Sequence, residues 1–66
     1  MPRITLTAPD IGCEHCAMTI KKALNNLPVS NVQVDVPTKQ VSFDYTDEKV
    51  LQEAKAELER IGYPVQ

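Results

Sequence analysis

The sequence predicts an α+β domain in which the elements follow the order strand, helix, strand, strand, helix, strand. Two observations support this order. Apolar and polar residues alternate in three segments, and apolar residues recur at intervals of three and four in two others. Strands and helices with one apolar face each pack as two layers. We therefore expect a four-stranded antiparallel sheet with both helices on one face, the ferredoxin-like βαββαβ sandwich.

Three of the four expected strands show the alternation of a half-buried strand, over residues 4–8, 31–36 and 41–45. The sequence Pro-Thr-Lys-Gln at 37–40 is typical of a short turn, so the second and third strands should form a hairpin. The fourth strand is expected at residues 63–65. It should be a short edge strand, because its proline lacks the N–H group that a central strand needs.

The two expected helices cover residues 14–27 and 47–61, where the apolar residues form one stripe along each helix. Pro28 should end the first helix. Thr46 is a suitable N-cap for the second, and acidic residues follow it in the first turn, where the helix dipole favours them. Gly62 should close the second helix as its terminal glycine.

The length of 66 residues predicts one domain, residues 1–66, with a core too small to enclose an organic substrate. We therefore expect a shallow surface site and no enzyme activity. The net charge is −2 with both signs mixed along the chain, which argues against a nucleic-acid partner. We also see no signal peptide and no apolar run that could insert in a membrane, so we expect a cytoplasmic protein with reduced thiols.

The chemistry that the sequence suggests lies at Cys13 and Cys16, where the loop after the first strand meets the first helix. At this spacing both sulfurs can converge on one ion, and the N–H groups at the start of the helix stabilise thiolates. Two thiolates are soft ligands suited to Cu(I), which accepts two-coordination, whereas Zn²⁺ generally needs four ligands. His15 is either a third ligand or, as we expect, a residue that points outward beside the site. Met18 lies on another side of the helix and should be exposed.

The segment Ala-Pro-Asp-Ile-Gly-Cys-Glu-His-Cys at 8–16, followed by a helix, a hairpin, a second helix and Gly-Tyr, resembles the heavy-metal-associated domain family. The similarity extends over essentially the whole chain. It is greatest to bacterial copper chaperones and to the metal-binding domains of copper-transporting P-type ATPases. The resemblance implies that Cys13 and Cys16 bind Cu(I) and pass it to such an ATPase domain by thiolate exchange.

The resemblance also implies roles for residues outside the cysteine pair. Ile11 stands where the family usually has a Met that packs beneath the loop without binding the ion. Tyr63 should stand next to the loop that holds Cys13. Lys21 and Lys22 would be a docking patch for an acidic partner, although an ordinary solvated helix face explains them equally well.

Two alternative functions remain open at this stage. The domain could bind zinc or another divalent ion by using His15, an acidic neighbour or a second copy of the chain. It could also be a thiol–disulfide redox protein, since Cys-x-x-Cys after a strand occurs in such proteins, but the chain is short for that fold. Whether an ion bridges two copies into a homodimer is also left open.

Overall fold

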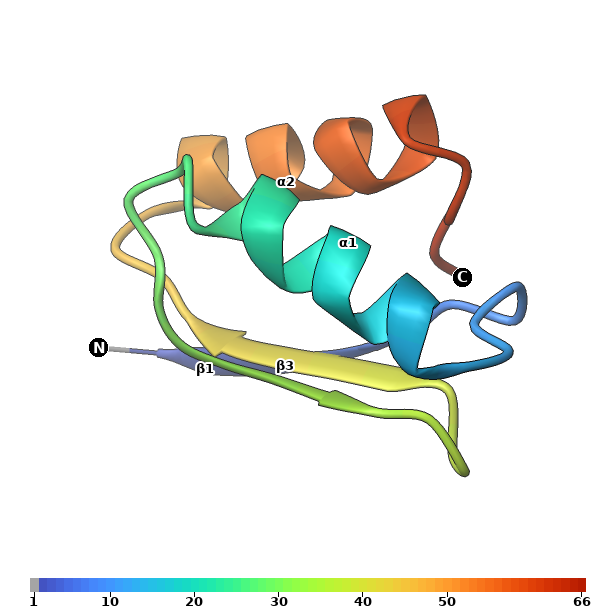
Figure 1. The fold of residues 1–66 in the computed structure, drawn as a ribbon. Coiled ribbons are helices and arrows are strands. Elements are labelled where there is room, and N and C mark those ends of the chain that lie inside the picture. Colours follow the sequence, from blue (N-terminus) through green and yellow to red (C-terminus); the bar gives the residue numbers. More distant parts are fainter. Residues whose placement is uncertain (1) are drawn as a thin grey trace.

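The computed structural model describes residues 2–66 and shows two helices packed on one face of an antiparallel sheet (Figure 1). The sheet has three strands in the order β1-β3-β2, so the hairpin strand β3 is central. The elements follow one another along the chain as β1 (Arg3–Thr7), α1 (Glu14–Leu24), β2 (Ser30–Asp35), β3 (Gln40–Asp44) and α2 (Glu48–Arg60). The predicted α+β class, the antiparallel sheet and the position of both helices are confirmed.

The register of the sheet places the apolar residues of all three strands on the face below the helices. Leu6 of β1 and Val34 of β2 both lie opposite Val41 of β3, from its two sides. The pairing of β2 with β3 is irregular between Ser30 and Gln33. In the pleat of a strand, alternate side chains point to opposite faces, so the polar residues face outward on the other side.

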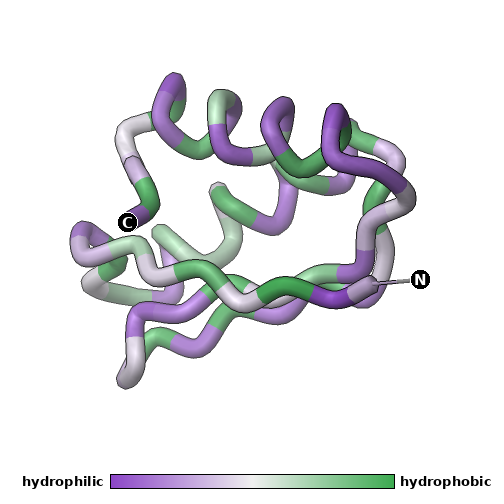
Figure 2. Tube along the Cα trace, turned by 180° about the vertical axis from the view of Figure 1, so that it is seen from behind, coloured by the Kyte–Doolittle hydropathy of each residue, from purple (hydrophilic) through white to green (hydrophobic). Residues whose placement is uncertain are grey.

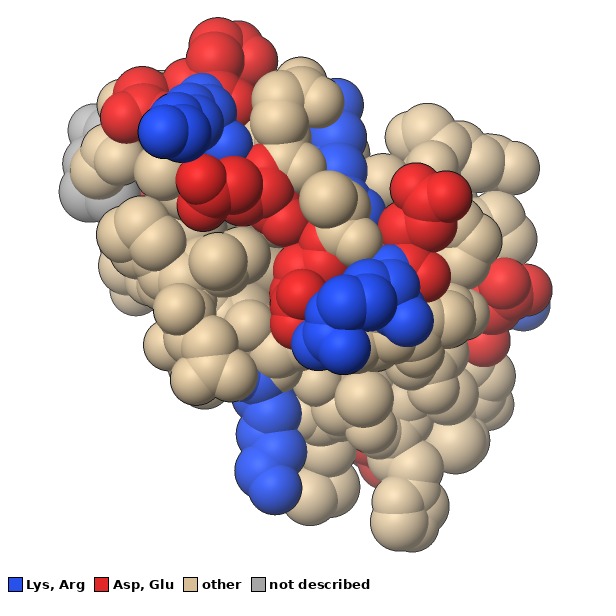
Figure 3. Space-filling model, turned by 90° about the horizontal axis from the view of Figure 1, so that it is seen from above, with Lys and Arg blue, Asp and Glu red and all other residues tan. Residues whose placement is uncertain are grey.

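The core lies between the sheet and the helices. In the view of Figure 2, hydrophilic positions dominate the outer side of α2, and hydrophobic positions lie toward the sheet. The largest fully buried side chains come from every layer: Phe43, Ile11, Ile20, Leu24, Leu58 and Val41. Seen from the helix side, acidic and basic side chains are interspersed (Figure 3), and one pair, Glu57 and Arg60, lies 2.6 Å apart.

The predicted fourth strand at 63–65 is wrong, because the end of α2 uses the hydrogen bonds that a strand would need. The N–H of Gly62 donates to the carbonyl of Glu59, and the N–H of Tyr63 donates to the carbonyl of Leu58. This pair of bonds, with Gly62 at φ +95°, is the Schellman helix ending. The next residue is Pro64, which has no N–H to donate. The segment therefore meets the sheet through a single bond, from the N–H of Gln66 to the carbonyl of Thr7 (2.8 Å).

Two further helix ends differ from the prediction. The first helix stops at Leu24 instead of residue 27, because the chain tightens into i→i+3 bonds such as that from the N–H of Leu27 to the Leu24 carbonyl (2.9 Å). The N-cap of α2 is Asp47, not Thr46. The Asp47 carboxylate accepts a hydrogen bond from the N–H of Val50 (3.0 Å), and this satisfies one of the free donors of the first turn. The expected glycine ending is confirmed.

Candidate metal centre

Cys13 and Cys16 are free thiols whose Sγ atoms lie 3.8 Å apart. Cys13 is the N-cap residue of α1 and has an extended backbone, while its carbonyl accepts from the N–H groups of Cys16 (3.1 Å) and Ala17 (3.3 Å). The first turn of the helix therefore holds both sulfurs on the same side. An ion about 2.3 Å from each sulfur, the usual zinc–thiolate distance, would lie beside the line that joins the two atoms and bridge them at an angle of about 110°.

The two thiols differ in exposure and acidity. Cys13 is exposed, whereas Cys16 is half-buried. Interactions with the Tyr63 hydroxyl, with the backbone of Gly12 and, to a smaller extent, with Cys13 lower the pKa of the Cys16 thiol to about 7, against an opposing effect of burial. The contact between Tyr63 and Cys16, together with burial and the nearby cysteines, raises the pKa of the Tyr63 hydroxyl. At neutral pH about half of Cys16 is therefore already the thiolate that binds metal and acts as a nucleophile.

Tyr63 reaches this sulfur because of the way in which α2 ends. The residue directly follows Gly62, whose left-handed backbone turns the chain out of the helix axis and back toward the metal loop. The resemblance placed Tyr63 beside the loop at Cys13. In the structure its hydroxyl contact is with Cys16, the second cysteine, on the first turn of the helix.

Ile11 lies beneath the loop and is completely buried in the core cluster. Its N–H donates to the carbonyl of Ala8 (3.1 Å), which closes the turn that contains Pro9 and Asp10. The loop is therefore anchored to the core two residues before Cys13. A buried aliphatic residue here holds the loop without offering any atom to an ion.

The other residues considered for the site are on the surface. His15 is exposed, and its carbonyl accepts a hydrogen bond from the Thr19 hydroxyl (2.9 Å). Met18 is 60% exposed. Within residues 2–66, no set of three or more His, Cys, Asp or Glu side chains is arranged to hold a metal ion.

Sequence reasoning did not anticipate the part that Gly12 plays in the acidity of Cys16. The signal was weak, because any residue before the first cysteine has a backbone that could lie near the second sulfur. Among residues 2–66, no helix is long and apolar enough to cross a membrane.

Comparison with known proteins assigns the chain to a family. The model of the heavy-metal-associated domain family matches residues 5–64, and the chain belongs to that family. Copper chaperone CopZ of Staphylococcus aureus (strain MRSA252) is 34% identical over 67 residues, which cover 98% of each protein.

Solved structures agree with this assignment. The structure of a CopZ metallochaperone superposes with a TM-score of 0.89 at 33% identity, over 98% of this chain and 100% of that one. Oxidized MerP from Ralstonia metallidurans CH34 also gives a TM-score of 0.89, at 31% identity, over 98% of this chain and 93% of that one. The two-layer arrangement described above is thus the fold of this family.

Proposed function

We propose that this domain, residues 1–66, is a cytoplasmic Cu(I) carrier that holds one ion between Cys13 and Cys16. The observation that carries the proposal is the pair of free thiols, 3.8 Å apart at the start of α1, of which Cys13 is exposed and the half-buried Cys16 has its pKa lowered to about 7. Two soft thiolates match the preference of Cu(I), and the similarity to copper chaperones supports the same ion.

The exposure of Cys13 supports transfer of the ion rather than storage. A two-coordinate ion at the surface has room for a third sulfur, so a partner thiolate can bind before any bond breaks. We propose that Cys13 leaves first, because it is exposed and its sulfur lacks the Tyr63 contact. A second partner thiolate then displaces Cys16. Each step exchanges one copper–sulfur bond for another, and the departing thiolate takes up a proton from water.

We propose that the partner is the metal-binding domain of a copper-transporting P-type ATPase, because the sequence resembles that class and such a domain offers the same pair of thiolates. Receiving and donating sites are then chemically equivalent, so the direction of transfer follows from relative affinity and concentration. The same chemistry allows one ion to join two copies of this chain, which would be a side reaction of an open site.

The proposal is tested by titrating the reduced protein with Cu(I) and, separately, with Zn²⁺, each against a competing chelator. We expect one Cu(I) per chain, held far more tightly than Zn²⁺. Cys13→Ser and Cys16→Ser should each abolish tight binding and keep the fold, since neither residue is among the buried core residues. His15→Asn is the matched control and should retain Cu(I).

Two results would contradict the proposal. One is a monomer that binds tetrahedral Zn²⁺ as strongly as Cu(I), and the other is unfolding of Cys16→Ser, which would make Cys16 a core residue. Disulfide reduction is assayed separately, and activity comparable to that of a redox protein would favour the redox alternative.

A further inference from the structure

The two edge strands of the sheet, β1 and β2, differ in whether another segment of the chain bonds to them. At the β1 edge, the C-terminal segment reaches the strand and the N–H of Gln66 donates to the Thr7 carbonyl (2.8 Å). At the β2 edge, no other strand of the described residues 2–66 is paired. An edge strand that is neither paired nor covered presents a row of backbone donors and acceptors to any chain that can lie beside it.

The hydrogen-bond pattern identifies which backbone groups of β2 face outward. The N–H of Ala8 bonds the Lys39 carbonyl across the β1–β3 ladder, so the odd-numbered residues of β3 face β1 and the even-numbered ones face β2. Gln33 and Asp35 of β2 lie opposite even-numbered partners and use their backbone groups there. It follows that the N–H and C=O groups of Val32 and Val34 point away from the sheet.

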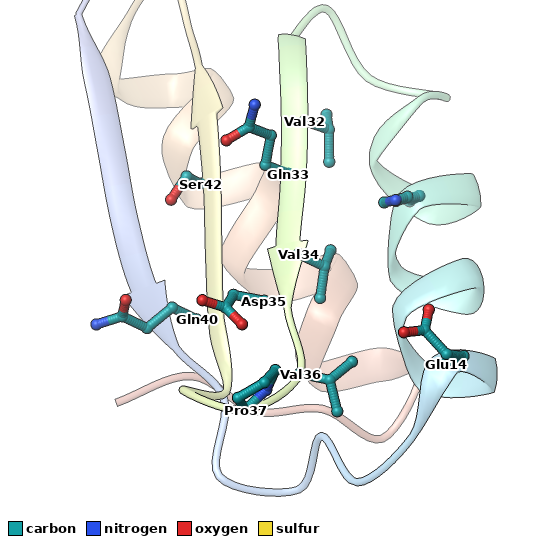
Figure 4. Close-up of a pocket in the computed structure, with 10 residues that line it drawn as sticks. Glu14, Val32, Gln33, Val34, Asp35, Val36, Pro37, Gln40 and Ser42 are labelled. Atoms are coloured by element: carbon teal, nitrogen blue, oxygen red, sulfur yellow. The ribbon is translucent and has the colours of Figure 1, made fainter.

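A groove of about 490 Å³ extends from the outer face of β2 and β3, over the edge of β2, to α1 (Figure 4). The side chains of Val32, Val34 and Val36 point toward α1 and contribute half-buried aliphatic surface. Polar side chains of β2 and β3 line the rest of the groove: Gln33, Asp35, Gln40 and Ser42. The opposite wall is α1, which contributes Glu14 and Lys21. An aliphatic stripe, free backbone groups and a helical wall are together the features with which an edge strand binds an extended peptide.

The charges on the helical wall define what that peptide should carry. Glu14 lies at the Val36 end of the groove (Figure 4), and Lys21 follows two helical turns later, about 10 Å along α1. Four residues of an extended chain span about 13 Å, so two long side chains at positions i and i+4 can reach both charges. Antiparallel pairing with β2 places the N-terminal end of the peptide at Glu14.

We propose that the groove between β2 and α1 binds an extended segment of a partner protein by strand addition to the edge of β2. The segment has the pattern basic-x-aliphatic-x-acidic, with its basic residue at Glu14, its aliphatic residue against Val34 and its acidic residue at Lys21. The binding uses neither cysteine, because neither lines the groove, although Glu14 directly follows Cys13. It adds a second interaction surface to the proposed metal carrier.

The probe is the blocked peptide Thr-Lys-Thr-Val-Thr-Glu-Thr, added to the ¹⁵N-labelled, reduced, metal-free chain. We expect saturable shifts of the Val32 and Val34 amide signals with a Kd below about 1 mM. Methylation of the peptide's valine nitrogen, which faces β2, should weaken binding about tenfold. Methylation of the preceding threonine nitrogen, which faces solvent, should change the Kd by less than about twofold.

The charge assignment is tested with a matched pair of variants. Lys21→Glu should weaken the peptide about three- to tenfold, since it replaces attraction by repulsion. Lys22→Glu, next to it but outside the groove, should change the Kd by less than about twofold. The dispersion of the amide signals checks that both variants are folded.

Three outcomes would overturn the proposal. The first is that the peptide shifts no signal of β2 below millimolar concentration. The second is that both methylated peptides bind alike, which would exclude strand addition. The third is that the Val32 and Val34 signals move with protein concentration alone, which would assign the edge to a second copy of this chain.

Discussion

Removing the Tyr63 hydroxyl should make Cys16 a weaker acid. This hydroxyl is the largest of the influences that hold the pKa of Cys16 at about 7, and the Gly12 backbone contact remains when it is lost. If Cys16 becomes a tenfold weaker acid in Tyr63→Phe, the thiolate fraction at pH 7 falls from about one half to about one tenth. Because only the thiolate reacts with an alkylating agent, the reaction at pH 7 should slow about fivefold.

The assay is the rate of alkylation by iodoacetamide between pH 5.5 and 9.5, followed by mass spectrometry in a Cys13→Ser background, where Cys16 is the only thiol. The midpoint of the rate profile should lie at a lower pH with Tyr63 than in Tyr63→Phe, both compared in this background because the Cys13 side chain also contributes to the lowered pKa. Tyr45→Phe is the matched control, because the Tyr45 ring packs edge-on against Phe43 (centroids 6.4 Å apart). Identical profiles for Tyr63→Phe and the parent would refute the argument.

The same contact links folding stability to pH, with a sign that follows from the direction of the shift. The pKa of Cys16 in the folded chain lies below its ordinary value of 9.0. The folded state is therefore favoured fully above pH 9, and this contribution is lost as the pH falls through about 7. Denaturation curves of the parent should show this trend, and Tyr63→Phe should show less of it.

Three further predictions concern the N-cap of α2, the buried residue beneath the metal loop and the ring of Tyr63. Asp47→Ala should destabilise the fold by about 0.5–2 kcal/mol and lower Tm by several degrees, because the N–H of Val50 loses its cap; an equal loss in Thr46→Ala would contradict this assignment. Ile11→Ala should cost about 2–5 kcal/mol in urea denaturation and Ile11→Met less than about 1.5, whereas similar costs would mean that the loop repacks freely. Tyr63→Ala should lose Cu(I) to a chelator faster at unchanged stoichiometry, and a rate equal to the parent's would reduce Tyr63 to a ring that covers the edge of the core.

The features that could be predicted from the sequence are those that depend on neighbouring residues. Alternation located all three observed strands to within about one residue, since the side-chain period of a strand is local. The glycine ending at Gly62 was equally local, because few other residues accept its backbone angle. The choice between Thr46 and Asp47 as N-cap could not be made from the local sequence. Both residue types cap helices, and only the path of the chain decides which one starts the helix.

The predictions that failed did so because a backbone or side-chain group has a different contact partner from the one that the sequence pattern assumes. Residues 63–65 have the composition of a short edge strand, yet the N–H of Tyr63 bonds within the helix ending, and this bond is invisible in a strand pattern. At the candidate site, the spacing of Cys13 and Cys16 predicted that their sulfurs converge. The contact of Tyr63 with Cys16 depends on the angle at which α2 meets the loop. The groove beside β2 likewise depends on the angle at which α1 crosses the sheet. Neither the alternation that indicates strands nor the spacing that indicates helices predicts the angle between two elements.

The Schellman ending of α2 determines where the domain can tolerate an inserted residue. The connection between Leu24 and Ser30 lies at the end of α1 away from the sulfurs, so an inserted residue there can bulge into solvent and leave the thiols as they are (Figure 1). One residue inserted between Gly62 and Tyr63 would carry the hydroxyl past Cys16 and leave both cysteines in place. Related chains should therefore vary in length at the first junction and keep a constant length at the second.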